Sequence, residues 1–298
     1  MPRQPLAEVF GFPIDNNSPQ AERHRRLKLC PFNNKVPNCT KDKAKDPLGV
    51  CSILQNDAPV ITCPVRFREE WLIAEDAAAF FFGPDVQWTS LTEVRLPDKH
   101  GKSAGNIDVV LVAYDQNGQV TDFGSLEVQA VYISGNVSLP FKYFMQAPAE
   151  RADMDWSKQP LYPRADFLSS SRKRLAPQLI FKGGILRAWQ KKMAVALDSA
   201  FWATLPAIPQ VPATEADMAW LIYDLERDES EKRFHLARVQ TIYTRFEQAL
   251  DVITRPEVGD LSLFMGYLQR QLDARLGSAP INALVEPPFE EDADATDI

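Results

Sequence analysis

The chain has 298 residues, of which 45% are hydrophobic and 10% aromatic, enough apolar side chain to build a packed core. No stretch approaches the roughly 20 apolar residues of a membrane span, and the N-terminal residues lack the apolar core of a signal peptide, so we expect a cytoplasmic protein. The net charge of −7 argues against a protein that coats nucleic acid without sequence preference.

Basic residues are nevertheless concentrated in two segments. Residues 21–45 carry eight Lys or Arg against two acids, and residues 172–192 carry seven and no acid. Residues 1–20 contain several prolines and the run NNSPQ, so we expect an irregular arm there. Residues 21–29, AERHRRLKL, are compatible with a short basic helix or with a solvated face.

All four cysteines lie within 34 residues, among Pro, Asn, Lys and Gly. Because cytosolic proteins rarely keep disulfides, this grouping favours a metal site with four thiolate ligands, and the metal would supply the free energy that so polar a segment lacks. The spacings differ from the paired CxxC motifs of common zinc sites and do not choose between zinc and iron. Four unrelated reduced cysteines are the alternative. The candidate ligands are Cys30, Cys39, Cys51 and Cys63.

Two helices are expected before the central strands. Residues 64–83 begin at a proline, contain good helix formers and end at a Gly-Pro pair. Residues 85–97 fit a shorter helix with Glu93 in its last turn. Residues 99–105, KHGKSAG, form a basic loop that leads into the first strand.

Residues 105–135 contain two apolar runs joined by a segment with an Asn-Gly turn signal, which predicts an antiparallel hairpin. Alternation places Asp108 on one face of the first run, and Glu127 and Gln129 together on one face of the second. The hairpin would therefore project two carboxylates and an amide from the middle of a sheet.

The second half of the chain is less regular at first. Residues 136–170 are rich in Pro, Asp, Ser and aromatics and predict a long excursion without regular structure. Residues 175–204 predict a helix in two parts, broken at Gly183-Gly184.

The remaining segments return to the core. Residues 218–244 show two apolar runs with a charged connection, which predicts a second hairpin in the same sheet. Residues 245–254 and 258–276 predict closing helices, the latter with leucines at helical spacing.

The three polar residues of the central hairpin suggest a chemistry. Two carboxylates on neighbouring strands repel each other unless a cation lies between them. Magnesium favours carboxylate ligands beside a substrate phosphate, where it can activate water and stabilise developing charge. Asp108 followed by Glu127-x-Gln129 therefore predicts a magnesium-dependent nuclease centre. A glycosidase also needs paired acids, but it would leave the Gln, the basic segments and the cysteines unexplained. Polar strand residues without a function are the other alternative.

The run NIDVVLVAYDQNGQVTDFGSLEVQAVYISGN, residues 106–136, resembles the active-site hairpin of the NotI-type restriction endonucleases. The four-cysteine segment is similar to that family's N-terminal element, which holds iron in a rubredoxin-like setting. The resemblance implies an α/β fold of the PD-(D/E)XK restriction-endonuclease type, a mixed sheet flanked by helices with an N-terminal four-Cys metal element. The implied domains are an arm and metal element at 1–65, a nuclease core at 66–280 and a disordered acidic tail at 281–298.

The resemblance also assigns roles to single residues. Asp108 and Glu127 match the residues that hold catalytic magnesium, and Glu93 matches a helical glutamate that completes the centre. Gln129 stands where most of these nucleases have lysine, and since an amide neither titrates nor carries charge it can only orient water or a ligand. Iron or zinc would be the structural metal of the four cysteines.

The implied function is that of a type II restriction endonuclease, a bacterial homodimer that cuts duplex DNA at a GC-rich palindrome similar to CGGCCG, one strand per subunit. Arg or Lys would read the guanines, although most candidates would contact phosphate instead. A non-enzymatic metal-containing DNA-binding or scaffold protein and a DNA-repair nuclease are the alternatives. The candidate DNA-binding residues are Arg23, Arg25, Arg26, Lys28, Arg172, Arg174, Lys182 and Arg187.

Overall fold

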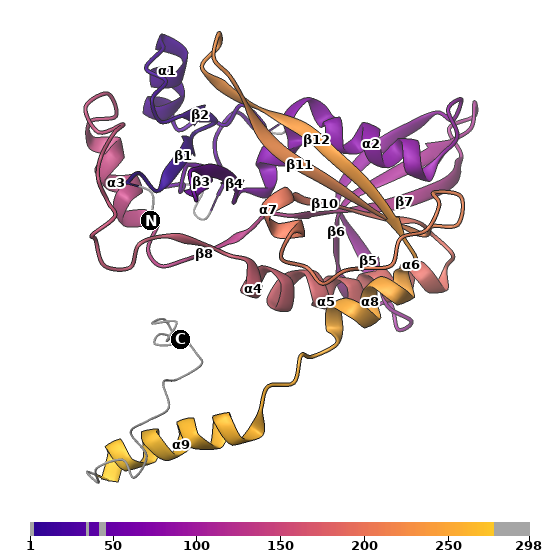
Figure 1. The fold of residues 1–298 in the computed structure, drawn as a ribbon. Coiled ribbons are helices and arrows are strands. Elements are labelled where there is room, and N and C mark those ends of the chain that lie inside the picture. Colours follow the sequence, from indigo (N-terminus) through magenta and orange to yellow (C-terminus); the bar gives the residue numbers. More distant parts are fainter. Residues whose placement is uncertain (1–2, 34–35, 42–45, 277–298) are drawn as a thin grey trace. The chain divides into compact units, whose positions relative to one another are not determined.

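The computed structural model describes residues 3–33, 36–41 and 46–276 (Figure 1). The chain divides into two compact units, Met1–Thr254 and Arg255–Ile298. The acidic tail predicted from residue 281 lies outside the described residues, and the predicted domain boundaries at 65 and 280 stay predictions.

The centre of the first unit is a mixed sheet, whose order within the described residues is β12-β11-β10-β7-β6-β5. Strands β5, β6 and β7 form an antiparallel meander, β10 runs parallel to both β7 and β11, and β12 returns antiparallel to β11. The strands are β5 (Trp88–Pro97), β6 (Ser103–Tyr114), β7 (Val120–Gln129), β10 (Met193–Asp198), β11 (Met218–Asp228) and β12 (Arg233–Thr244).

Helices cover both faces of this sheet, as Figure 1 shows. On one face, α2 (Leu72–Phe81) packs its alanines against Leu126 and Val128. On the other face, Leu175, Leu179 and Leu186 of a long helical segment pack against Val195 and Leu197 of β10. The sheet is therefore flanked by helices, as predicted.

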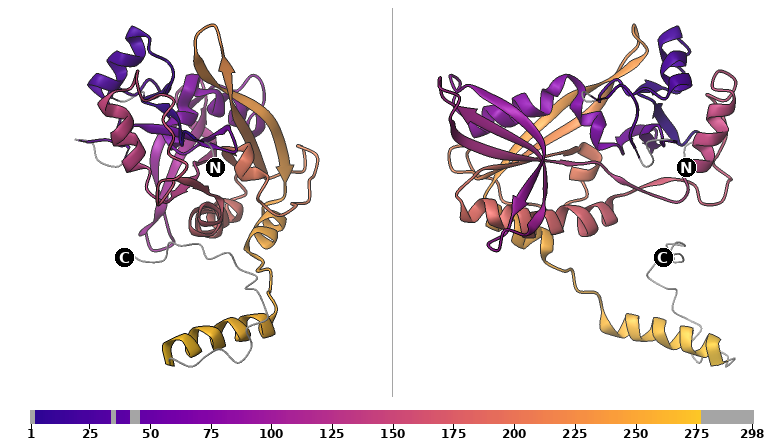
Figure 2. Two further views of the ribbon diagram at one scale, coloured as in Figure 1. Left: turned by 60° about the vertical axis from the view of Figure 1, so that its left-hand side comes forward. Right: turned by 180° about the vertical axis from the view of Figure 1, so that it is seen from behind.

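The long helical segment, residues 167–188, is continuous but alternates between α and π turns. Figure 2 shows it from behind, running below the meander. The helix α8 (Phe246–Thr254) packs on the same side. The parts of the segment are α4 (Phe167–Ser169), η2 (Ser170–Leu175), α5 (Ala176–Gln178), η3 (Leu179–Gly183) and α6 (Gly184–Ala188).

The two predicted hairpins are confirmed. β6 and β7 pair through Val109↔Leu126 to Val112↔Phe123, and β11 pairs with β12 in the same sheet. The closing helices are also present, as α8 and as α9 (Leu261–Leu276) in the second unit. Long periodic segments were thus predictable because their pattern repeats many times.

The N-terminal segment was predicted wrongly. The irregular arm expected at residues 1–20 is not what the described residues form, because β1 and β2 join β3 and β4 in a small sheet of order β2-β1-β3-β4. Strands of two to four residues have too little pattern to be recognised in the sequence. The basic stretch does form a helix, α1. The elements are β1 (Leu6–Val9), β2 (Phe12–Pro13), α1 (Pro19–Leu27), β3 (Val50–Gln55) and β4 (Ala58–Ile61).

Two further helix predictions were wrong. Residues 85–97 form the strand β5, where alternate residues Thr89, Leu91 and Glu93 face solvent and the backbone pairs with β6. Within residues 175–204, β10 is a fully buried strand whose run Met-Ala-Val-Ala-Leu lacks alternation because both of its faces are covered. The helix also continues through Gly183-Gly184 rather than breaking there.

The excursion at 136–170 contains short regular elements that the sequence did not reveal. The helix expected at 64–83 is present, but it is kinked at Glu69 and Glu70 into a 3₁₀ part, η1 (Pro64–Trp71), and α2. The short elements of the excursion and its surroundings are β8 (Tyr132–Ser134), α3 (Ser138–Gln146), β9 (Arg164–Asp166) and, after β10, α7 (Ser199–Trp202).

Candidate active site

The meander brings the two predicted acids together. The β6–β7 ladder includes the pair Val109↔Leu126, and Asp108 comes directly before Val109 while Glu127 comes directly after Leu126, so the two acids lie beside each other on antiparallel strands. Asp108 is partly buried and its Oδ2 accepts the backbone N–H of Val128 at 2.9 Å. Glu127 is completely buried. The two carboxyl groups lie close enough for the charge of Asp108 to act on Glu127.

The surroundings of Glu127 disfavour its charged form. Burial raises the pKa of Glu127 to about 8, and the negative charge of Asp108 adds to the rise. Lys182 opposes it, donating from Nζ to Glu127 Oε2 at 2.6 Å. The other oxygen, Oε1, is buried and has no hydrogen-bond partner among the described residues. The site therefore offers an unused carboxylate oxygen in a setting short of positive charge.

Gln129 is also buried, on the same face of β7 as Glu127. Its Nε2 donates to the amide oxygen of Gln178 in the helical segment 167–188. Its own oxygen, Oε1, has no hydrogen-bond partner within the described part of the chain. The amide nitrogen of Gln129 is thus fixed by a hydrogen bond, while its amide oxygen remains available as an acceptor.

Glu93 lies on a strand and not on the helix that the sequence suggested. The ladder pairs Thr92↔Val109 and Val94↔Ile107 place it opposite Asp108. Its backbone has a φ of 56°, in the left-handed region, which costs a non-glycine residue energy and is often found at functional sites. Its side chain is 53% exposed and lies 4.0 Å from Arg68 Nη2. Glu93 therefore borders the two acids by strand pairing.

Two of the predicted DNA-binding residues have their charged groups buried and bonded inside the protein. Lys182 is buried against Glu127, and Arg25 is buried and donates to the backbone carbonyls of Pro13 and Asn16. Their charged groups bond to other parts of the protein and are therefore not available to contact DNA.

The other candidates are more accessible. Arg187 forms ion pairs with two acids at 3.4 and 3.5 Å, and Arg174 donates to the backbone carbonyl of Ala130. Lys28 forms an exposed ion pair with Asp46 at 2.6 Å. Arg187 is nevertheless exposed, and the other candidates that are exposed on α1 or the helical segment 167–188 are Arg23, Arg26 and Arg172.

The four cysteines surround one small cavity of about 10 Å³, close to the volume of a single water-sized sphere. Three of them are buried and Cys30 is partly buried. Burial raises the pKa of the Cys30 thiol to about 11, and the nearby Cys63 and Cys39 raise it further. Among the described residues, however, no three of their sulfur atoms lie within 4.8 Å of one another.

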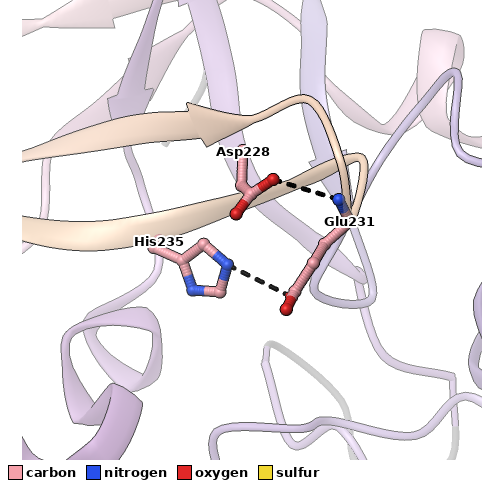
Figure 3. A group of neighbouring side chains, drawn as sticks. All are labelled: Asp228, Glu231 and His235. Atoms are coloured by element: carbon pink, nitrogen blue, oxygen red, sulfur yellow. Dashed lines mark hydrogen bonds and ion pairs between the residues drawn. The ribbon is translucent and has the colours of Figure 1, made fainter.

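One group of possible ligands was not anticipated from the sequence. Asp228, Glu231 and His235 have side-chain atoms within 4.8 Å of one another at the turn between β11 and β12 (Figure 3). Asp228 Oδ1 accepts the backbone N–H groups of Ser230 and Glu231, which closes the turn. His235 lies 3.4 Å from Glu231 and, through its other nitrogen, 3.4 Å from Glu69. Closure of the turn and the ion pairs of His235 explain why these three side chains lie close together.

Comparison with known proteins identifies the class. The family model for restriction endonuclease NotI matches residues 8–236, more than half of the chain. The protein is therefore a type II restriction endonuclease, a site-specific deoxyribonuclease that acts on double-stranded DNA. It belongs to the NotI restriction endonuclease family.

The matched range contains every predicted catalytic residue and all four cysteines. The alternative of a non-enzymatic scaffold is thereby set aside. A search of curated proteins gave no match. Within the described residues, none of the helices has the length and apolar character needed to cross a membrane.

Proposed function

We propose that the protein hydrolyses duplex DNA with magnesium held by Asp108 and Glu127. One observation carries this proposal: two acids lie side by side on adjacent inner strands, and the buried Glu127 Oε1 has no hydrogen-bond partner among the described residues. Carboxylate oxygens are preferred magnesium ligands, and restriction endonucleases generally use this metal. Bound there, magnesium would stabilise the charge that builds on the phosphate.

The other residues of the site would position the reaction. Gln129 can orient the attacking water through its free amide oxygen, but it cannot take up a proton. Glu93 would complete the centre from β5, opposite Asp108. Asp108 is fixed by the N–H of Val128, which keeps one of its oxygens in place.

The strand order supports assignment to the PD-(D/E)XK nucleases. The acids lie on the second and third strands of an antiparallel meander, and a helix then leads to a parallel fourth strand, β10. By its length the chain resembles EagI, a member of the family that reads CGGCCG. We therefore propose a GC-rich palindrome as the target.

A palindromic target fits a homodimer in which each subunit cuts one strand. The exposed Arg23, Arg26 and Arg172 are the candidates best placed to meet DNA. Light scattering after size exclusion, with and without a duplex that carries the target site, would measure the oligomeric state. We expect twice the chain mass, and a monomer in the DNA complex would contradict the homodimer.

The four cysteines are proposed to hold one structural iron or zinc. Their common cavity of about 10 Å³ supports this, because all four cysteines line it, and binding of one ion would draw their sulfur atoms closer together than they are here. Elemental analysis of purified protein should give one metal per chain, and Cys39→Ser should reduce both metal content and thermal stability. A folded protein without metal would contradict the site.

The central test is a plasmid digest with magnesium, followed by sequencing of the cut ends. We expect discrete fragments from the native enzyme and none from Asp108→Ala or Glu127→Ala. Both variants should still bind the target duplex, measured by mobility shift in Ca²⁺. Cleavage by either variant at the native rate would remove that residue from the proposed centre.

A further inference from the structure

The helical segment 167–188 supplies two side chains to the proposed centre. Gln178 bonds to Gln129 and Lys182 bonds to Glu127. Gln178 and Lys182 are four residues apart on the helix, and Glu127 and Gln129 are two residues apart on the strand. Both separations correspond to about 6 Å along the element. The segment therefore pairs with β7 in register, although the two belong to different layers.

Lys182 is built into this contact and is not a mobile surface lysine. Its side chain is 9% exposed, and its Nζ lies 2.6 Å from Glu127 Oε2. A Cβ placed on Gly105 of β6 would lie 3.5 Å from Lys182 Cε, so the lysine stem passes closely over that strand. Lys182 also lies in the π turn η3, and single π turns within helices are frequent at functional sites.

The strand pattern by itself leaves the centre short of positive charge. Asp108 and Glu127 carry two negative charges when ionised, which one divalent cation would balance. Gln129 adds no charge. A phosphodiester then brings a further negative charge, and more charge builds on it in the transition state, so an additional cation beside the acids would favour the reaction.

We propose that Lys182 supplies from the helix the positive charge that Gln129 does not supply from the strand. It holds Glu127 through Oε2 and leaves Oε1 for the cation. This inference rests on the proposed function, and it makes Lys182 a positioning residue of the reaction rather than a DNA-reading residue.

The first test compares Lys182→Met and Lys182→Arg with the matched control Lys192→Met. Lys192 lies outside the proposed centre and donates to the backbone carbonyl of Phe80. We expect Lys182→Met to lose about 100-fold in cleavage rate at saturating magnesium, and Lys182→Arg to lose less, because it keeps the charge. Binding of target DNA in Ca²⁺ should stay within about threefold for both, and Lys192→Met should cleave normally.

The second test moves the charge back to the strand. Gln129→Lys in the Lys182→Met background should recover cleavage by about tenfold, because the cation again lies beside Glu127. A purely structural loss would not be recovered by a lysine at a different position. If Lys182→Met alone does not fold, the double variant should restore both folding and cleavage, and failure to do so would overturn the inference.

A third measurement does not depend on cleavage. Thermal unfolding without metal should give a lower Tm for Lys182→Met, because buried Glu127 loses the donor at its Oε2. Glu127→Gln should lower the Tm less in the Lys182→Met background than in the native chain, because the interaction it removes is already absent. Equal effects in the two backgrounds would contradict the pairing of Lys182 with Glu127.

The outcomes separate this inference from the proposed function. If Glu127→Ala is inactive while Lys182→Met cleaves within threefold of the native enzyme at saturating magnesium, only the role of Lys182 is overturned. If Glu127→Ala cleaves normally, the proposed centre itself is wrong.

Discussion

Glu93 shows how a single residue can be predicted for its chemistry and misjudged in its structure. The sequence placed it in a helix, whereas it lies on β5 opposite Asp108 with a φ of 56°. A left-handed backbone at a residue with a side chain costs roughly 1–2 kcal/mol. Other non-glycine residues of the chain share a positive φ, so the role proposed for Glu93 rests on its place opposite Asp108.

Two substitutions at Glu93 separate strain from function. Glu93→Gly should be more stable than Glu93→Ala by about 1 kcal/mol, because glycine adopts a positive φ without penalty. Both variants should cleave DNA at least about tenfold more slowly than the native enzyme, since both lack the carboxylate. Urea unfolding and single-turnover cleavage measure the two effects. Equal stability of the two variants would show that the backbone is unstrained.

Asp198, at the end of β10, links the central sheet to the N-terminal sheet. Its Oδ2 accepts the N–H of Ile61 at 3.0 Å, and its Oδ1 accepts the N–H of Ala200 at 2.9 Å. Burial raises its pKa to about 6. Because the folded pKa is raised, this group stabilises the protein at low pH, and that stabilisation is lost as the pH rises through about 6.

The pH dependence can be isolated with Asp198→Asn, which does not titrate at this position. The unfolding free energy of the native protein, minus that of the variant, should fall by about 1 kcal/mol between about pH 5 and pH 7.5. Urea titrations at both pH values would measure this difference. A difference that grows with pH would mean that the folded pKa of Asp198 is lowered.

At the scale of elements, the helical segment 167–188 depends on close contact with α8. A Cβ on Gly183 would lie 2.3 Å from Phe246 Cε2 and 2.8 Å from Cζ, whereas a Cβ on Gly184 would meet nothing within 4 Å. Gly183 is therefore required by packing, and the Gly-Gly pair is not the helix break that the sequence suggested.

These two glycines provide a matched pair of substitutions. Gly183→Ala should destabilise the protein by about 1–3 kcal/mol and slow cleavage, because the helix must shift and Lys182 is its direct neighbour. Gly184→Ala should be neutral or stabilising by up to about 1 kcal/mol, since alanine favours helix. Thermal unfolding and cleavage rates of both variants test this. Equal behaviour would show that the contact with Phe246 is easily relieved.

The errors at this scale have a common origin. The strands β5 and β10 were taken for helices, because their residue types tolerate both structures over short windows. Pairing with β6 and β7 decides the outcome, and pairing is a tertiary property. The β6–β7 hairpin was predictable because its alternation and turn agree with each other.

At the scale of the whole molecule, the chain consists of two compact units that divide after Thr254. The family match ends at residue 236, inside the first unit, and α8 completes the core of that unit with Phe246 and Ala249. The second unit contains α9, which exposes several leucines within its own unit.

A truncation after Thr254 should fold as a cooperative unit with a Tm within about 3 °C of the full chain. A truncation after Thr244 also removes α8 and should lower the Tm by about 10 °C or abolish folding, because Phe246 and Ala249 are buried. Circular dichroism melts would compare the two. Loss of folding in the longer form would show that the second unit is needed for stability.

The sequence alone determined the central hairpin, its two acids and amide, the cysteine grouping and the class of enzyme, because these features are local in the chain. Only the tertiary structure decided that Lys182 lies against Glu127, that Arg25 is internal and that Glu93 lies opposite Asp108 on a strand. Each of these is a contact between distant segments. Such contacts depend on the registers of strands and helices, which residue types in sequence do not specify.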